Sequence, residues 1–115
     1  MVIKKFEDII AWQKAQDLAV DIYAVCEGVK DYGFKNQICN AVVSISNNIA
    51  EGFDRSSDAD FSRILYIANA SCSEVKSMLY LAERIKFIGR EKVLQLIEQC
   101  EEVARVIRGL IKSLN

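Results

Sequence analysis

Residues 37–52 read QICNAVVSISNNIAEG, and this stretch decides the fold. Its apolar residues recur three or four positions apart, which predicts an amphipathic helix; they are Ile38, Val42, Ile45 and Ile49. A neighbouring stripe carries polar side chains where surface helices normally carry Lys and Glu; it consists of Gln37, Ser44, Asn48 and Glu51. A stripe of this kind beside a core predicts a seam that is at least half buried. A buried polar atom without a partner costs about 1–3 kcal/mol, so we expect these groups to be hydrogen bonded.

Segments with the same helical periodicity follow one another along all 115 residues, and the chain contains no proline. We predict helices over about residues 7–27, 35–51, 58–87 and 90–114. Four glycines punctuate this pattern, where a helix can end in a left-handed residue: Gly28, Gly33, Gly52 and Gly89. Short connections make antiparallel neighbours. The sequence therefore predicts an all-α fold with a single domain over 1–115, an antiparallel up-down-up-down four-helix bundle of left-handed twist.

Local signals mark the third and fourth helices. Ser57 is the expected N-cap of the third helix, with Asp58 and Asp60 favouring its positive end. Gly109 lies inside the fourth helix, where it costs about 1 kcal/mol relative to alanine. It either allows a close helix approach or marks fraying near the end.

Composition limits the partners and the compartment. The chain has 15 basic and 16 acidic residues, so a net charge of −1 gives no global attraction to nucleic acid or anionic lipid. No apolar run approaches the ~20 residues that span a bilayer. Lys4 and Lys5 are not followed by the apolar region of a signal peptide. We expect a cytoplasmic protein without a membrane partner.

The four cysteines fit no zinc-binding spacing. Each lies on or near the apolar side of a predicted helix, which favours small buried hydrophobic side chains; they are Cys26, Cys39, Cys72 and Cys100. The alternative is a disulfide pair in an oxidising compartment.

The chain contains no histidine, and this argues against an enzyme. Without histidine there is no usual general base, no Ser-His-Asp triad and no Glu-x-x-His di-iron motif. The sequence also lacks a P-loop and a dinucleotide-binding glycine motif. Glu51 and Glu74 are the acids expected on the core side, but their helix positions separate them by more than ~10 Å. We predict no catalytic residue, no metal site and no cofactor.

The third predicted helix carries more apolar surface than a monomeric bundle needs. One stripe runs through Phe61, Leu65, Ala68, Cys72, Val75, Leu79 and Ala82. A second contains Ile64, Ile67, Met78, Leu81, Ile85 and Ile88, and Tyr66 and Tyr80 lie further round. Our hypothesis is that part of this arc forms a homo-oligomer interface. The alternative is that the bundle and the N-terminal segment cover it entirely.

Basic residues gather where the first and third connections meet at one end of the bundle. They are Lys30, Lys35, Arg84, Lys86, Arg90 and Lys92, with Glu27, Asp31, Glu83 and Glu91 among them. The opposite end has Arg105, Arg108 and Lys112 near Arg55, again mixed with acids. Lys35, Arg84, Lys86, Arg90 and Lys92 are candidate RNA or DNA contacts, because clustered cations displace counterions from phosphates. A mixture of charges is also typical of a plain solvated surface.

Motifs along most of the chain resemble the bacterial four-helix-bundle family of 23S rRNA intervening-sequence proteins. They are residues 6–9 and 11–15, Tyr32 to Phe34, Gln37-Ile38, Ser44-Ile45, Asn48 to Gly52, Arg55, Ser57, Phe61, Arg63, Leu65, Ala68, Ser71 and Glu74. The resemblance implies a ring-shaped homopentamer and, from the family's name, nucleic-acid binding. The family name itself reflects the location of its genes, not chemistry.

The chain departs from that family at four positions. Relatives commonly have two arginines at Cys39 and Asn40, proline at Ser46 and glycine at Ala70. The missing arginines weaken the RNA-binding expectation and leave the fold expectation intact. We expect a non-enzymatic oligomeric interaction module, with an RNA- or DNA-binding accessory protein as the alternative.

One set of residues carries both the predicted seam and the family motif. We call it the polar seam: Gln37, Ser44, Asn48, Glu51, Gly52, Ser71 and Glu74. Its interpretation is structural, because polar groups inside a helix interface often fix register and partner number. Asn48 and Glu51 are expected to bind the following turn or to pair with Arg55 or Arg63. Direct contact with a ligand is the alternative.

Overall fold

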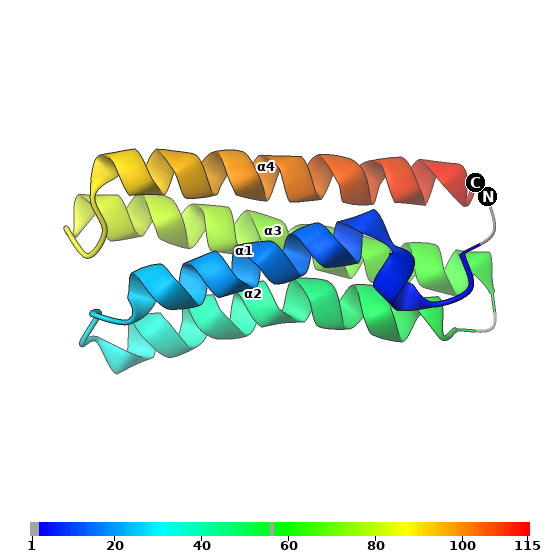
Figure 1. The fold of residues 1–115 in the computed structure, drawn as a ribbon, viewed down its shortest axis with the longest axis horizontal. Coiled ribbons are helices and arrows are strands. Elements are labelled where there is room, and N and C mark those ends of the chain that lie inside the picture. Colours follow the sequence, from blue (N-terminus) through cyan, green and yellow to red (C-terminus); the bar gives the residue numbers. More distant parts are fainter. Residues whose placement is uncertain (1–2, 56) are drawn as a thin grey trace.

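Four α-helices and one short 3-10 helix make up the computed structural model, which describes residues 3–55 and 57–115. The elements are η1 (Phe6–Asp8), α1 (Ile10–Cys26), α2 (Tyr32–Phe53), α3 (Asp58–Arg84) and α4 (Arg90–Ser113). Consecutive helices run antiparallel along a molecule of 43 × 22 × 19 Å (Figure 1). Each helix packs on two neighbours, with α4 closing the ring against α1. The predicted all-α four-helix bundle is confirmed; its handedness stays a prediction.

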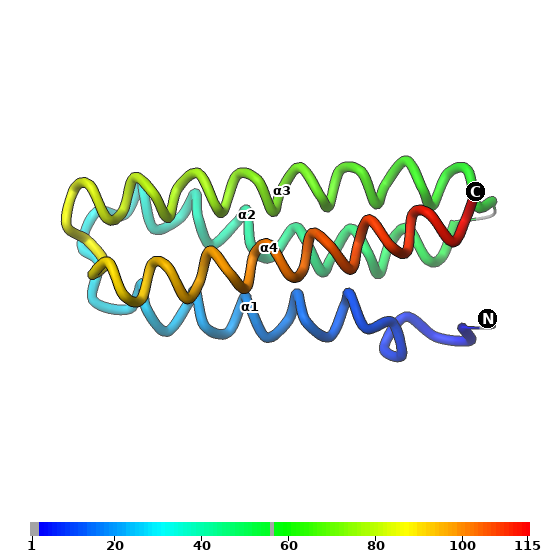
Figure 2. Tube along the Cα trace, turned by 90° about the horizontal axis from the view of Figure 1, so that it is seen from above, coloured from blue at the N-terminus to red at the C-terminus, as the bar shows by residue number. Residues whose placement is uncertain are grey.

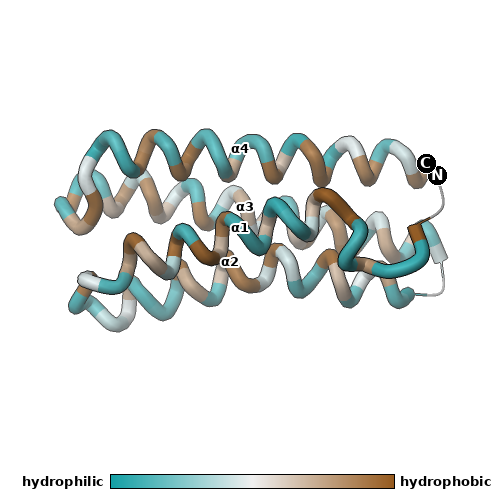
Figure 3. The backbone as a smooth tube through the Cα atoms, in the orientation of Figure 1, coloured by the Kyte–Doolittle hydropathy of each residue, from teal (hydrophilic) through white to brown (hydrophobic). Residues whose placement is uncertain are grey.

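The stripe predicted from residues 37–52 forms the core side of α2. Its four members are fully buried: Ile38, Val42, Ile45 and Ile49. They meet the predicted apolar stripe of α3 and the inner faces of α1 and α4 in one continuous core. Apolar residues recur along every helix at about one-turn intervals, as the hydropathy-coloured trace shows (Figure 3). This periodicity explains why the fold could be read from the sequence.

The glycine prediction is wrong in detail. Gly33 and Gly52 lie inside α2, which begins at Tyr32 because the Asp31 side chain accepts a hydrogen bond from the Phe34 amide, at 3.0 Å. Within the described residues no glycine has a positive φ. The left-handed residue is Lys86, with φ 64°. There the Phe87 amide donates to the Ala82 carbonyl at 2.9 Å and closes α3 with a Schellman motif.

The beginning of α3 agrees with the prediction. The Ser57 side chain accepts a hydrogen bond from the Asp60 amide at 3.1 Å. Asp58 and Asp60 lie in the first turn, where negative charge complements the helix dipole. The helix ends at Arg84, three residues before the predicted end, because Lys86 reverses the backbone.

The N-terminal segment packs on one side of the bundle. The rings of Phe6 and Trp12 meet edge to face with centroids 5.3 Å apart. The side-chain amide of Gln13 donates a hydrogen bond to the backbone carbonyl of Glu7 at 2.9 Å, which anchors η1 to α1. In the described structure η1 contacts α1 and α2 and makes no contact with α3. The segment lies away from α3, which is seen on the other side of the bundle in Figure 2. It therefore leaves the outer surface of α3 uncovered.

Among residues 3–55 and 57–115, no helix has the hydrophobicity that a membrane-spanning segment of its length requires.

Candidate functional site

The centre of the polar seam is a hydroxyl contact between α2 and α3. The Ser44 and Ser71 hydroxyl oxygens are 2.7 Å apart, and Ser44 also lies 2.7 Å from the Ala41 carbonyl. Ser71 lies 3.3 Å from the Ile67 carbonyl. Each hydroxyl has one proton, so one serine donates to the other and the second donates to its own helix. The pair fixes the register of α2 on α3 without any charge.

The two ends of the seam are less buried than predicted. The Gln37 amide donates to the Glu74 carboxylate at 3.2 Å, and both residues are exposed. Glu51 is exposed as well, so the expectation that Glu51 and Glu74 face the core is wrong. The reason is that the seam follows the outward groove between α2 and α3. Half-buried Asn48 donates to the Ser44 carbonyl at 2.7 Å.

Among the described residues, Asn48 and Glu51 form no pair with Arg55 or Arg63, contrary to the expectation. Arg63 binds Asp60 at 3.1 Å, and Arg55 lies 3.9 Å from the same carboxylate. This local cluster occupies both guanidinium groups at the first turn of α3. Asn48 and Glu51 are left to interactions within α2 or with solvent.

Gly52 is the most constrained member of the seam. An added Cβ would lie 2.9 Å from Phe61 Cδ1 and 3.1 Å from Ile64 Cγ2. Both partners belong to the first turns of α3 and are buried. The Phe53 and Phe61 rings pack edge to face beside it, with centroids 6.1 Å apart. Gly52 is therefore required for close helix packing and not for a turn, which the sequence interpretation missed.

Ser46 is another polar contact that sequence reasoning missed. It is buried on the other flank of α2, and its hydroxyl accepts a hydrogen bond from the Gln16 amide of α1 at 3.1 Å. Sequence could have pointed to it, since Ser46 replaces a proline common in the similar family. A hydroxyl there can receive a donor from α1, which the ring of proline cannot.

A surface with few charges extends from the polar seam across α2 and α3, where the exposed charged residues Arg63, Glu74 and Arg84 lie beside it. No Asp, Glu, Lys or Arg occurs between residues 36 and 50. On α3, five large hydrophobic side chains are exposed around Glu74, and we call them the α3 patch: Tyr66, Ile67, Tyr80, Leu81 and Ile85. The rest of its second predicted stripe is covered, with Ile64 and Ile88 buried and Met78 half-buried. The bundle alone therefore does not cover the arc.

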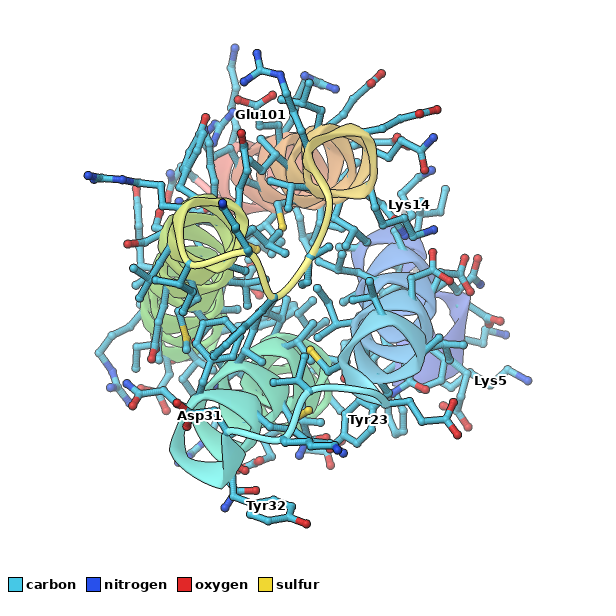
Figure 4. All side chains as sticks on the ribbon, turned by 90° about the vertical axis from the view of Figure 1, so that its left-hand side faces the viewer. Lys5, Lys14, Tyr23, Asp31, Tyr32 and Glu101 are labelled. Carbon is cyan, nitrogen blue, oxygen red and sulfur yellow. The ribbon has the colours of Figure 1, made fainter. Side chains whose placement is uncertain are left out.

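The predicted basic end exists as a set of surface side chains. The connections after α1 and after α3 lie at the same end of the bundle (Figures 1 and 4). Arg84, Lys86, Arg90 and Lys92 are exposed there, and Lys35 is half-buried. Arg90 pairs with Glu83 at 3.2 Å. Among described residues the other four candidate cations form no ion pair within 4.0 Å.

The four thiols are free and buried, as expected from the helical pattern. Burial raises the pKa of Cys26 to about 11 and the pKa of both Cys72 and Cys100 to about 12. These thiols stay protonated at neutral pH, so they are poor nucleophiles and poor metal ligands. Within residues 3–55 and 57–115 no three Cys, Asp or Glu side chains gather to hold a metal ion.

Comparison with known proteins agrees with this architecture. The sequence model described as 23S rRNA-intervening sequence protein matches residues 7–109. The chain belongs to this family. The match spans the seam, all of α1, α2 and α3, and most of α4, so the resemblance of the motifs is confirmed.

A solved member of the S23 ribosomal protein family from Bacteroides thetaiotaomicron has the same fold. It is 28% identical, covers 90% of this chain and 99% of its own, and superposes with a TM-score of 0.83. That protein is itself described as having unknown function. No curated protein matches the sequence. The comparisons therefore establish family and fold and leave the activity to be argued from the surface.

Proposed function

We propose that this family member is a non-enzymatic interaction module that works as a homo-oligomer. The observation that carries the proposal is the surface of α2 and α3, which has few charges and includes the α3 patch. Among the described residues ten large hydrophobic side chains are exposed, and half of them lie on this patch. Exposed apolar surface with few charges is typical of protein interfaces, because charged groups are depleted at their cores.

The size of the bundle suits such a contact. Its broad side measures 43 × 22 Å, which accommodates the ~800 Å² per partner of a stable interface. The Ser44–Ser71 pair and the Gln37–Glu74 contact would lie at the edge of that interface and hold α2 and α3 in register. This gives the polar seam an oligomer-specifying role and agrees with its place in the family motif.

A ring needs a second surface, because each subunit in a cyclic assembly binds two neighbours through different faces. Helix α1 lies diagonally opposite α3 (Figure 4), and the backbones of the two helices do not come close to each other in the described structure. The α1 face that we consider consists of exposed Val20 with exposed Ile10 on the side of α4 and exposed Tyr23 on the side of α2. We propose that the α3 patch of one subunit binds this α1 face of the next. The family resemblance favours five subunits.

Two leucines with equal exposure provide a direct test. Leu81 in the α3 patch and Leu94 on α4 are each 47% exposed. Leu81→Lys places a charge in the proposed contact, where it loses solvation, so sedimentation velocity should show dissociation of the assembly. Leu94→Lys is the matched control and should leave the mass unchanged. Equal behaviour of the two variants would contradict the proposal.

Nucleic-acid binding is the second candidate, favoured by the unpaired cations at the basic end. A ring would repeat these side chains once per subunit and raise the local positive potential. Fluorescent structured RNA and duplex DNA should then bind with an affinity that falls steeply as salt rises. Replacing Arg84, Lys86, Arg90 and Lys92 by Gln should abolish this binding. Absence of binding at low salt would eliminate this candidate.

A further inference from the structure

The flank of α3 that faces α4 has a hollow that the proposed oligomer does not use. Its volume is about 350 Å³, within the range of small-ligand sites. The hollow exists because small residues meet where the two helices approach, and its floor is formed by Cys72, Cys100 and Ala104. Longer side chains at these positions would fill the groove. The burial-raised pKa of both thiols keeps the floor uncharged.

Two polar stripes line the walls of this hollow. The Lys76–Glu101 hydrogen bond, 2.8 Å long, aligns α3 with α4 at one end. Because the helices are antiparallel, one turn back along α3 is one turn forward along α4. Ser73 therefore lies opposite Arg105, and the next turn brings Arg108 into the lining. Among the residues described as lining the hollow, Glu101 is the acid that the cations face.

The two arginines form no close ion pair in the described structure, although Arg105 lies near enough to Glu101 and Glu102 to lower the pKa of both carboxyl groups. Neither Arg105 nor Arg108 forms an ion pair within 4.0 Å among those residues. They project from the same side of α4, one turn apart, so their like charges repel each other. Lys76 adds a third positive charge and Ser73 a hydroxyl donor. Guanidinium groups and a hydroxyl converging on one hollow match the oxygens of a phosphate group.

We propose that the α3–α4 groove binds a phosphomonoester, with Arg105 and Arg108 holding the phosphate, Ser73 donating a hydrogen bond and Lys76 adding charge. The phosphate can come from a free nucleotide or from the 5′ end of an RNA. In both sources the phosphate is attached to a hydroxyl-bearing ribose. The site is open on one side and is expected to bind with modest affinity.

The test uses the full-length protein, titrated with AMP and with inorganic phosphate at constant ionic strength. Calorimetry should show AMP binding, and adenosine should not bind. The Arg105→Gln/Arg108→Gln variant should weaken AMP binding at least ~10-fold, the loss expected when charge-assisted hydrogen bonds are removed. Because both side chains are exposed, the fold should survive, and circular dichroism checks this. Glu101→Gln should strengthen binding by freeing Lys76.

A charge-matched control separates a site from general attraction. Lys4→Gln/Lys5→Gln also removes two exposed positive charges, and Lys5 lies on the other side of the bundle (Figure 4). This variant should bind AMP normally. Equal weakening in both double variants, or no binding of AMP or phosphate at ~10 mM by the native protein, would overturn the proposal. Comparing 5′-phosphorylated with 5′-hydroxyl RNA hexamers then identifies the source of the phosphate.

Discussion

The two flanks of α3 differ in how they meet their neighbours. Toward α2 the contact is mostly neutral, with two serine hydroxyls in register, a glycine that allows close approach and the Gln37–Glu74 hydrogen bond at its rim. Toward α4 the contact is charged, with the Lys76–Glu101 pair beside Arg105, Arg108 and a hollow. A single helix can therefore offer a protein-binding surface and an anion-binding groove without conflict.

The largest stability effect is expected where the neutral flank is tightest. In Gly52→Ala the added methyl group collides with Phe61 and Ile64, and overpacking of this kind costs about 1–3 kcal/mol. The better helix propensity of alanine recovers at most about 1 kcal/mol. Urea denaturation at fixed protein concentration should therefore show net destabilisation.

Gly109→Ala is the control for this substitution, because nothing lies within 4 Å of its added Cβ. The open space around this Cβ also shows that Gly109 does not serve a close helix approach, which was one of its two sequence interpretations. We expect stabilisation of up to about 1 kcal/mol from helix propensity alone. If both glycine variants change stability in the same direction, close packing at Gly52 is not the reason for its presence.

A smaller effect should come from the serine pair. Ser44→Ala and Ser71→Ala each remove one partner of a half-buried hydrogen bond and should cost about 1 kcal/mol. Their effects should be non-additive by at least 0.5 kcal/mol or so in a double-mutant cycle. Ser77→Ala, at an exposed position of the same helix, should change stability by less than about 0.5 kcal/mol. Strict additivity would mean that the hydroxyl contact has no role in register.

The smallest effect is expected on the charged flank, where exposed ion pairs contribute little. The hydrogen bond between Lys76 and Glu101 lowers the pKa of Glu101 below 4.5. The same hydrogen bond raises the pKa of Lys76 above 10.5. The pair therefore stabilises the fold between these values. Its contribution disappears as pH falls through the folded pKa of Glu101 or rises through that of Lys76.

Melting temperatures across the pH range can detect this contribution. The difference between the native protein and Lys76→Gln should be small at neutral pH and vanish under acid. A difference that persists unchanged at pH values well below 4.5 would show that Lys76 acts through packing of its aliphatic chain.

Most of the fold could be predicted because it depends on repeated patterns. The apolar stripe of α2 recurs over three turns, and no single residue decides it. The N-cap at Ser57 was also readable, since the hydroxyl and the following acids act locally. The end of α3 could not be predicted from the sequence, because Lys86 occupies the left-handed position that normally selects glycine.

The candidate site was less predictable because it depends on which side of a helix faces solvent. The polar seam was identified by residue type, but its burial was overestimated at Gln37, Glu51 and Glu74. These residues lie on the outward sides of α2 and α3, at the rim of the contact between the two helices. The hollow beside Arg105 and Arg108 was not foreseen, since it requires the pairing of α3 with α4. Small residues and cations become a site only when two helices bring them together.

The central claim is that subunits join through the α3 patch of one copy and the α1 face of another. Mixing two variants tests it most directly. Leu81→Lys and Val20→Lys should each sediment as a monomer of 13.0 kDa, because each lacks one of the two faces. Mixed together, they still share one intact pair of faces and should form a dimer of twice that mass. A monomeric native protein, or a mixture that stays monomeric, would contradict the account.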